Sequence, residues 1–132
     1  MKGYVKDIGQ ATKENNNFRQ VVYTAKYCQL VLMSLKPAED IGEEVHDDVD
    51  QFFRFEEGEG KVVLDGVEHK IEVEYAVLVP AGTKHNIINT STTAPLKLYT
   101  IYSPPNHRDG VIHTTREEAE SDSEHFDGKT TE

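Results

Sequence analysis

Apolar and polar residues alternate in short runs through the middle of the chain, with turn residues between the runs. Gln20–Tyr27 and Gln29–Leu35 are rich in Val, Tyr and Leu, and Gln51–Phe55 alternates so that Gln51 and Phe53 share one face. A period of two residues is typical of strands buried on one side. The same reasoning predicts five further strands, at Lys61–Leu64, Val67–Ile71, Ala76–Val79, His85–Asn89 and Leu96–Tyr102.

The turns between these runs favour an all-β fold. Asp65-Gly66 is the strongest hairpin signal, and Gly58-Glu59-Gly60 and Pro80-Ala81-Gly82 mark two more turns. Many short strands without a helical period predict a sandwich or barrel. A helix is expected only near Arg116–Glu124.

Strand alternation also predicts what lines the interior. Phe53, Phe55, Met33 and Tyr99 are expected to line the barrel, as core residues first and as the wall of a ligand pocket second. Arg54 should face outward, opposite Phe53. No arginine or lysine can be assigned to the interior from this pattern.

The length of 132 residues predicts one domain. We expect a barrel domain over residues 1–110, with its core at about 18–102, and an acidic tail over 111–132 that is partly helical or disordered. From Arg116 to Glu132 the chain has seven acids and two bases, about half of its net charge.

The formal net charge of −10 argues against nucleic acid as a partner and, weakly, against anionic membranes. The single cysteine, Cys28, cannot form an intrachain disulfide. Met1–Gln10 is polar and has no stretch like a signal peptide, and no apolar run reaches membrane-spanning length. A cytoplasmic protein is expected.

Two of the six histidines lie in contexts that favour chemistry. His46 and Asp48 would point to one face of a strand, and a bend near Asp50 would return Gln51 to that face. His85 lies three residues beyond Gly82. Two histidines projecting from adjacent strands suit Zn, Fe, Mn, Ni or Cu. The other four, His69, His107, His113 and His125, are expected to be ordinary surface or core residues.

Here the chain resembles the cupin superfamily, in particular the small single-domain bacterial cupins often labelled mannose-6-phosphate isomerase-like. The family's second motif is G-x5-P-x-G-x2-H-x3-N, and from the proline onward it is complete in Pro80-x-Gly82-x2-His85-x3-Asn89. The first motif, G-x5-H-x-H-x3-4-E-x6-G, corresponds to Gly42-x3-His46-x-Asp48-x2-Gln51-x6-Gly58. The resemblance implies a double-stranded β-helix, or jelly-roll, barrel.

The resemblance also implies a metal held by the motif's histidines and acid. His46 matches the first histidine and His85 the last, while Asp48 replaces the second histidine and Gln51 the acid. We expect His46, Gln51 and His85 as ligands, with Asp48 as a fourth ligand or behind them. The alternative is a pocket without metal, in which the histidines hydrogen-bond to Asp48 or Gln51.

The resemblance leaves the function open, because cupins include enzymes, storage proteins and binding modules. We expect a small-molecule ligand and a metal-dependent enzyme of the dioxygenase or isomerase kind. The alternatives are a sugar-phosphate isomerase, which would need basic residues for its phosphate, a non-catalytic module for sugars or small molecules, and a scaffold with a vestigial pocket. No residue stands out as a catalytic base. A homodimer is expected, because an open barrel leaves sheet edges to cover.

Overall fold

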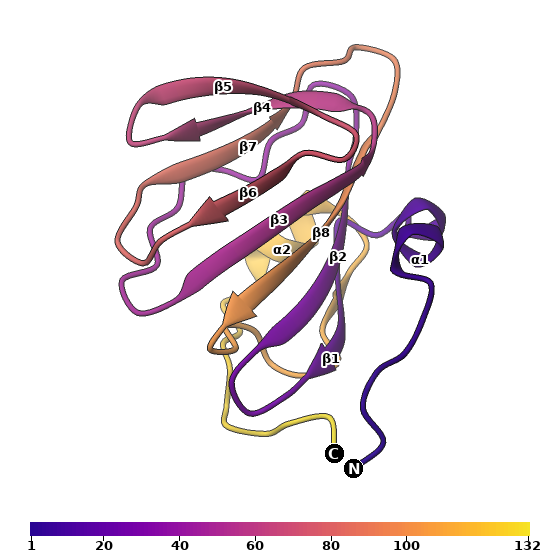
Figure 1. Ribbon diagram of the computed structural model, residues 1–132, viewed down its shortest axis with the longest axis vertical. Coiled ribbons are helices and arrows are strands. Elements are labelled where there is room, and N and C mark those ends of the chain that lie inside the picture. Colours follow the sequence, from indigo (N-terminus) through magenta and orange to yellow (C-terminus); the bar gives the residue numbers. More distant parts are fainter.

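The computed structural model describes all residues from Met1 to Glu132. Nine strands and two short helices follow one another along the chain (Figure 1). Their bounds are α1 Ile8–Glu14, β1 Arg19–Thr24, β2 Gln29–Leu35, β3 Asp50–Glu57, β4 Glu59–Leu64, β5 Val67–Glu72, β6 Ala76–Val79, β7 His85–Asn89, β8 Leu96–Ser103, β9 Ile112–His113 and α2 Arg116–Ser121. All eight predicted strands are present, with ends shifted by up to three residues. Neither helix is long and apolar enough to cross a membrane.

Two antiparallel sheets form the barrel. The larger has the strand order β6-β3-β8-β2-β1-β9, and the smaller has the order β5-β4-β7. Figure 1 shows the smaller sheet at the upper left and most of the larger sheet below it and to its right. This is the cupin-type jelly roll that the sequence predicts.

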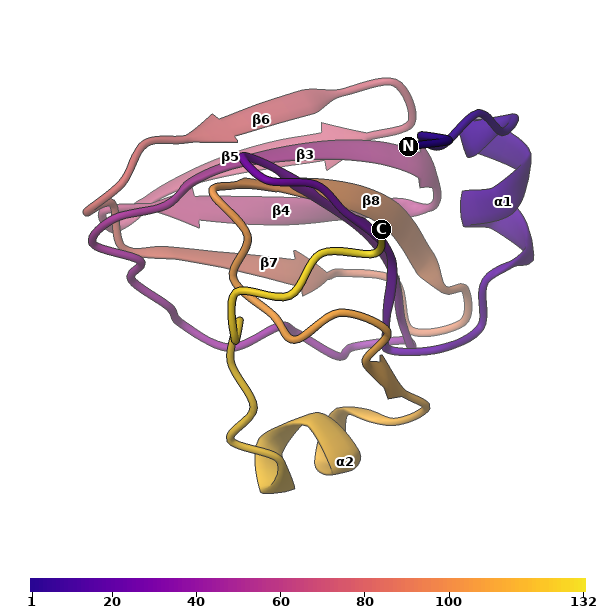
Figure 2. The ribbon, with the colours of Figure 1, turned by 90° about the horizontal axis from the view of Figure 1, so that it is seen from below.

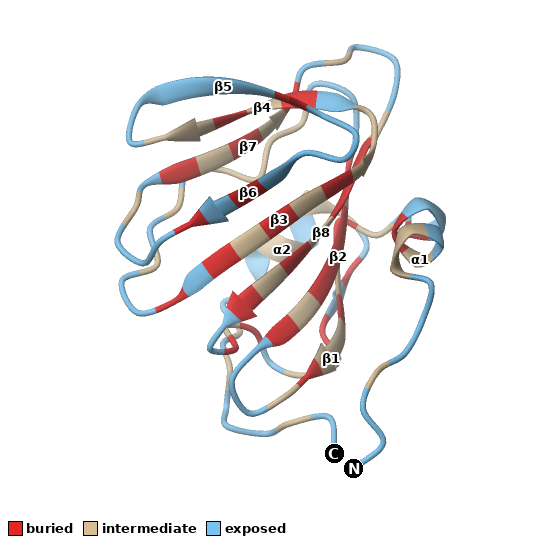
Figure 3. Ribbon diagram, in the orientation of Figure 1, coloured by how far each residue is buried: buried red, intermediate tan, exposed pale blue.

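The alternation predicted for the strands decides what lies between the sheets. Seventeen buried apolar side chains form one core, which combines the inner faces of both sheets. Buried and partly exposed residues alternate along β3 and β8 (Figure 3). Phe53, Phe55 and Met33 belong to this core, each at most 1% exposed. Arg54 points outward, as predicted, and pairs with Glu56.

Tyr99 lies on the outer face of the larger sheet. Its neighbours Leu98 and Thr100 are fully buried on the inner face, so Tyr99 must point the other way. There its ring lies 6.4 Å from the ring of Phe52. Tyr99 therefore does not line the interior, in contrast to the expectation from its aromatic character.

Across the larger sheet, one inward-facing row is polar. The register aligns Thr24 with Gln29, Gln29 with Tyr102, Tyr102 with Gln51, and Gln51 with Val79. The next inward row consists of Val21, Val31, Thr100, Phe53 and Val77, and is largely apolar. One end of the barrel interior is therefore suited to polar chemistry, while the rest is packed hydrocarbon.

Helix α1 was not predicted. Asp7 caps it by accepting a hydrogen bond from the backbone N–H of Gln10, and only Thr12 of its residues is buried. A short polar helix with one buried residue lacks the apolar period from which helices are predicted. It covers Lys97, whose ammonium group donates to the carbonyl of Lys13 and the side chain of Asn16.

The acidic C-terminal segment contains α2 and packs on the barrel. Thr115 caps α2, which lies within the stretch where a helix was expected. Beyond it, the backbone N–H of Phe126 donates to Asn106, and that of Thr131 donates to Thr24. Figure 2 shows this segment crossing one end of the barrel. The division of the chain at residue 110 stays a prediction.

Glycines at the start of β4 allow close contact between backbones. A Cβ at Gly60 would lie 2.3 Å from the carbonyl oxygen of Ile88, and one at Gly58 would lie 2.4 Å from that of Pro95. At the other end of β4, Asp65 and Gly66 both have positive φ angles, 47° and 84°. Two successive positive φ angles are typical of the type I′ hairpin turn that the sequence predicted there.

Gly60→Ala should lower the free energy of unfolding by about 1–3 kcal/mol, because the new methyl group would meet backbone that cannot rotate away. Urea unfolding followed by circular dichroism measures this loss. Gly9→Ala is the control, since its Cβ would lie 3.4 Å from the flexible side chain of Glu56 and alanine favours helix. Equal stability of the two variants would contradict the close approach of β4 and β7.

Candidate metal centre

Backbone pairing brings two distant segments of the chain together at the polar end. The N–H of Glu44 donates to the carbonyl of His85, and the N–H of His85 donates to that of Glu44, both at 2.9 Å. The N–H of Gly82, in the turn before β7, donates to the carbonyl of His46 at 2.8 Å. The segment around His46 is therefore held against β7, with its side chains beside His85.

Glu44, His46 and His85 form a cluster of potential metal ligands. One ligand atom from each lies within 4.8 Å of the others. Glu44 Oε2 is 3.3 Å from His46 Nε2 and 3.9 Å from His85 Nε2. Donors bound to one ion at about 2.0–2.2 Å lie at most about 4.4 Å apart. Both measured distances are within this limit, so Glu44 can share one ion with either histidine.

The position of the proton on His85 leaves its other nitrogen free. Nδ1 lies 3.0 Å from the carbonyl oxygen of Thr83, which only accepts, so Nδ1 carries the hydrogen. Nε2 is then a lone pair, and it is buried without a hydrogen-bond partner. The ring is 3% exposed and packs edge-on against Phe53. An oriented imidazole whose second nitrogen bonds a backbone carbonyl is the usual state of a metal-binding histidine.

Glu44 supplies negative charge to the cluster. Burial raises the pKa of its carboxyl, but the hydrogen bond from His46 and the positive charge of Arg19 lower the pKa further, below its ordinary value. Glu44 is therefore a carboxylate at neutral pH, the form that binds metal. The side chains of Glu44 and His46 are 31% and 18% exposed, so this side of the cluster faces solvent.

The two other predicted ligands have different surroundings. Gln51 is buried, its amide nitrogen donates to Thr100, and its amide oxygen has no partner. Asp48 is exposed, and its carboxylate is not part of the cluster. Asp50, at the start of β3, accepts a hydrogen bond from the backbone N–H of Ala81. Gln51 thus remains available as a further ligand, whereas Asp48 points away.

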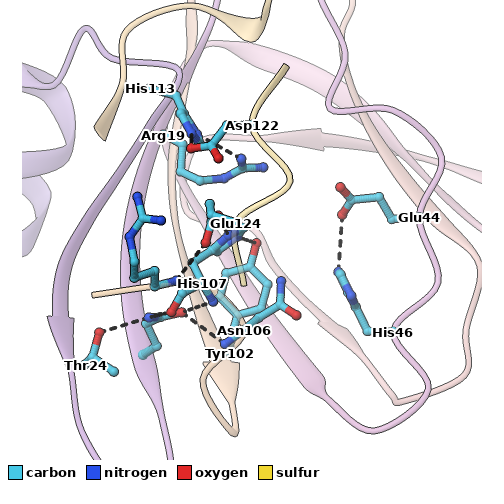
Figure 4. A network of polar contacts seen from close by, with 12 residues as sticks. Arg19, Thr24, Glu44, His46, Tyr102, Asn106, His107, His113, Asp122 and Glu124 are labelled. Carbon is cyan, nitrogen blue, oxygen red and sulfur yellow. Dashed lines mark hydrogen bonds and ion pairs between the residues drawn. The ribbon is translucent and has the colours of Figure 1, made fainter. Parts of the chain in front are cut away.

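A second polar group beside the cluster involves a hydroxyl, an imidazole and a carboxylate (Figure 4). His107 Nδ1 donates to Glu124 Oε1 at 2.6 Å, and the Tyr102 hydroxyl donates to His107 Nε2 at 3.1 Å. Burial raises the pKa of Tyr102, so its hydroxyl stays protonated. Burial lowers the pKa of His107, although Glu124 opposes this. The ring of Tyr102 also lies 6.0 Å from that of His46.

Gln29 fixes the loop that carries His107. Its side chain is fully buried, accepts from the backbone N–H groups of Asn106 and His107, and donates to the carbonyl of His107 and to Thr24. His107 was expected to be an ordinary surface or core residue. The structure shows a buried imidazole held on two sides.

A third group contains a buried arginine, which corrects the expectation that no basic residue lies inside. Arg19 is 8% exposed and faces inward from β1. Its Nη1 donates to His113 Nδ1 at 3.2 Å, and His113 Nε2 donates to Asp122 Oδ2 at 3.0 Å. The alternation of β1 puts Arg19 on the same face as Val21, but the apolar-rich run predicted there began only at Gln20.

Comparisons with known proteins identify the family. A family model described as a cupin domain matches residues 31–102. This chain belongs to the cupin family. The cupin is 48% identical over 124 residues to protein YrkC of Bacillus subtilis (strain 168), which covers 89% of this chain and 66% of YrkC. The chain thus spans slightly less than two thirds of that relative.

Two further relatives show how far the likeness extends. A protein of Acanthamoeba polyphaga mimivirus is 45% identical over 117 residues, covering 86% of this cupin and 72% of the viral protein. The crystal structure of BH2720 from Bacillus halodurans has a TM-score of 0.89 and 41% identity, covering 92% of this chain and 96% of that one. The jelly-roll fold, including the segments around it, is therefore shared.

Glu44 is the residue that the sequence analysis missed in this cupin. The period of two that was applied from His46 forward to Asp48 applies equally backward to Glu44. Asp48 was preferred because it occupies a motif position. The missing acid at Gln51 was a further signal, since a negative ligand lost at one position can be supplied from a neighbouring one.

Glu124→Gln should destabilise the cupin at pH 7, and this destabilisation should become smaller as the pH falls below about 4.3. Burial raises the pKa of Glu124, but the hydrogen bonds from His107 and the Arg108 N–H lower it below its ordinary value. A lowered pKa gives stability that is full above about pH 4.3 and is lost as the pH falls through the folded-state pKa.

Urea unfolding of wild type and Glu124→Gln at several pH values measures the difference in free energy of unfolding. Glu117→Gln is the matched control, because Glu117 is an exposed acid on α2. A Glu124→Gln effect that stays constant from pH 7 to 3 would contradict the charge-assisted contact with His107.

Proposed function

We propose that this cupin binds a divalent transition metal through Glu44, His46 and His85, with Gln51 as a further ligand, and uses it to act on a small polar molecule. The observation that carries the proposal is the buried lone pair on His85 Nε2, which faces the carboxylate of Glu44 and has no partner. A buried polar atom without a partner is costly, and a metal would satisfy it.

The donor set supports one class of chemistry over others. Two histidines and one carboxylate with open positions are typical of non-haem Fe(II) oxygenases. When bound, the metal would serve as a Lewis acid or as the centre that activates dioxygen. Glu44 and His46 hold the exposed side, while Phe53 keeps the His85 ring in place. A dioxygenase-like reaction is therefore preferred to sugar-phosphate isomerisation.

Tyr102 is a buried hydroxyl beside the cluster, with its ring 6.0 Å from that of His46. The hydroxyl bonds to His107 and lies on the same inward row as Gln51. If the hydroxyl oxygen took a proton from a bound molecule, its own proton would pass to His107 Nε2, whose other nitrogen is already bound to Glu124. This arrangement supports acid–base assistance to a molecule held at the metal.

A homodimer and a cytoplasmic location stay predictions. In the larger sheet, β1 lies between β2 and β9. The outer strands of that sheet are β6 and β9. Light scattering of the purified protein measures the mass of the assembly directly.

Elemental analysis of the purified protein should show about one equivalent of a transition metal, or should do so after incubation with Fe(II), Mn(II) or Zn(II). His85→Ala and His46→Ala should each bind at least about a hundredfold more weakly, since even residues behind the ligands contribute 10–100-fold. Absence of metal from wild type after reconstitution would favour a metal-free binding module instead.

Glu44→Gln and Asp48→Asn form a matched pair that distinguishes the two acids beside His46. Glu44→Gln should lose most of the metal because it removes the carboxylate from the cluster, while Asp48→Asn should bind like wild type. Isothermal titration calorimetry with Zn(II) gives both affinities. If Asp48→Asn loses the metal and Glu44→Gln retains it, the ligand set proposed here is wrong.

A further inference from the structure

The guanidinium of Arg19 is a buried cation with one edge free. Only Nη1 makes a hydrogen bond, to His113, and Nε is buried without any partner. No carboxylate forms an ion pair with it. The buried Nε atoms of Arg54 and Arg116 also lack hydrogen bonds, but those two arginines do form ion pairs. Arg19 is thus a buried arginine that forms no ion pair, unlike the more exposed Arg54 and Arg116.

An unpaired buried charge is costly, and proteins retain one where it serves a ligand or a network. The link through His113 to Asp122 positions one side of the guanidinium. The opposite side, formed by Nε and Nη2, presents two parallel N–H groups. This is the edge that binds a carboxylate through two hydrogen bonds at once.

Arg19 faces the same interior as the metal cluster, and its register partners Met33 and Leu98 lie two inward rows from Gln29 and Tyr102. Figure 4 shows its guanidinium between the His113–Asp122 pair and Glu124, with Glu44 and His46 across the interior. The guanidinium therefore faces the same interior that Glu44 and His46 border from the other side.

We propose that Arg19 binds the carboxylate of a small organic acid whose other end reaches Glu44, His46 and His85. The contact with the metal rests on the proposed function. The binding of the anion by Arg19 does not. The substrate class of the site is then carboxylic acids of a few carbon atoms.

The surroundings favour a carboxylate over a phosphate. A phosphate with close to two negative charges is usually held by several cations or N–H groups. Lys97 is on the outer side of the sheet, bound to Lys13 and Asn16, and Arg54 pairs with Glu56 there. One guanidinium edge matches the charge and shape of a single carboxylate.

The test is titration calorimetry of the 132-residue chain with malonate, succinate and acetate, and separately with inorganic phosphate, in metal-free and Zn(II)-loaded samples. Wild type should bind at least one of the carboxylates. Arg19→Met should bind it at least about tenfold more weakly, the effect expected for a charge-assisted pair. Lys84→Met, which removes an exposed lysine paired with Glu43, is the control for net charge and should bind like wild type.

Metal content measured on the same samples separates the two proposals. Loss of carboxylate affinity in Arg19→Met with full metal stoichiometry supports the anion site. Carboxylate binding by a wild type that takes up no metal would overturn the metal centre and leave the Arg19 site standing. Equal carboxylate affinity of wild type and Arg19→Met, or tighter binding of phosphate at Arg19, would overturn the carboxylate assignment.

A readout on the wild type covers the case in which Arg19→Met fails to fold. The Nε–H resonance of Arg19, assigned by its disappearance in Arg19→Lys, should shift on addition of the carboxylate, because Nε would gain its first hydrogen bond. A resonance that stays unchanged at saturating malonate, succinate and acetate would overturn the proposal.

Discussion

Two backbone hydrogen bonds between Glu44 and His85 hold the polar end of this barrel together. They join a segment without regular strand structure to the first residue of β7, 41 positions later in the chain, and the side chains of both residues then face one cluster. The turn at Gly82 adds a bond to His46. Because backbone rather than side chains makes these contacts, the ligands are positioned independently of whether an ion is bound.

The larger sheet contributes the other half of the site through its register. A single inward row carries Thr24, Gln29, Tyr102 and Gln51, and a shift of one residue in any strand would turn a member of this row outward. The apolar rows beside it supply the packing that fixes the register. The polar chemistry at one end therefore depends on the hydrocarbon core next to it.

The sequence predicted most of this frame, since strands, hairpin and turn glycines follow from local patterns. Helix α1 escaped prediction because its stability comes from the Asp7 cap and contacts with the sheet rather than from an apolar period. Glu44 and Arg19 escaped for another reason. Whether an acid or a base near a strand end points inward depends on pairing with distant residues, and one sequence does not reveal that pairing. His46 and His85 were predicted as ligands from the motif spacing. The structure shows them in one cluster with their ring centroids 5.5 Å apart.

The C-terminal segment delivers two acids to two buried imidazoles, Glu124 to His107 and Asp122 to His113. Each imidazole therefore depends on an acid that lies 9 to 17 positions further along the chain. Replacing Glu124 with an apolar residue would leave the buried Nδ1–H of His107 without an acceptor, and a buried donor without a partner destabilises a fold. The last turns of the chain thus act as a structural part of the barrel end that they cover, and removing them would leave two buried imidazoles without their acids.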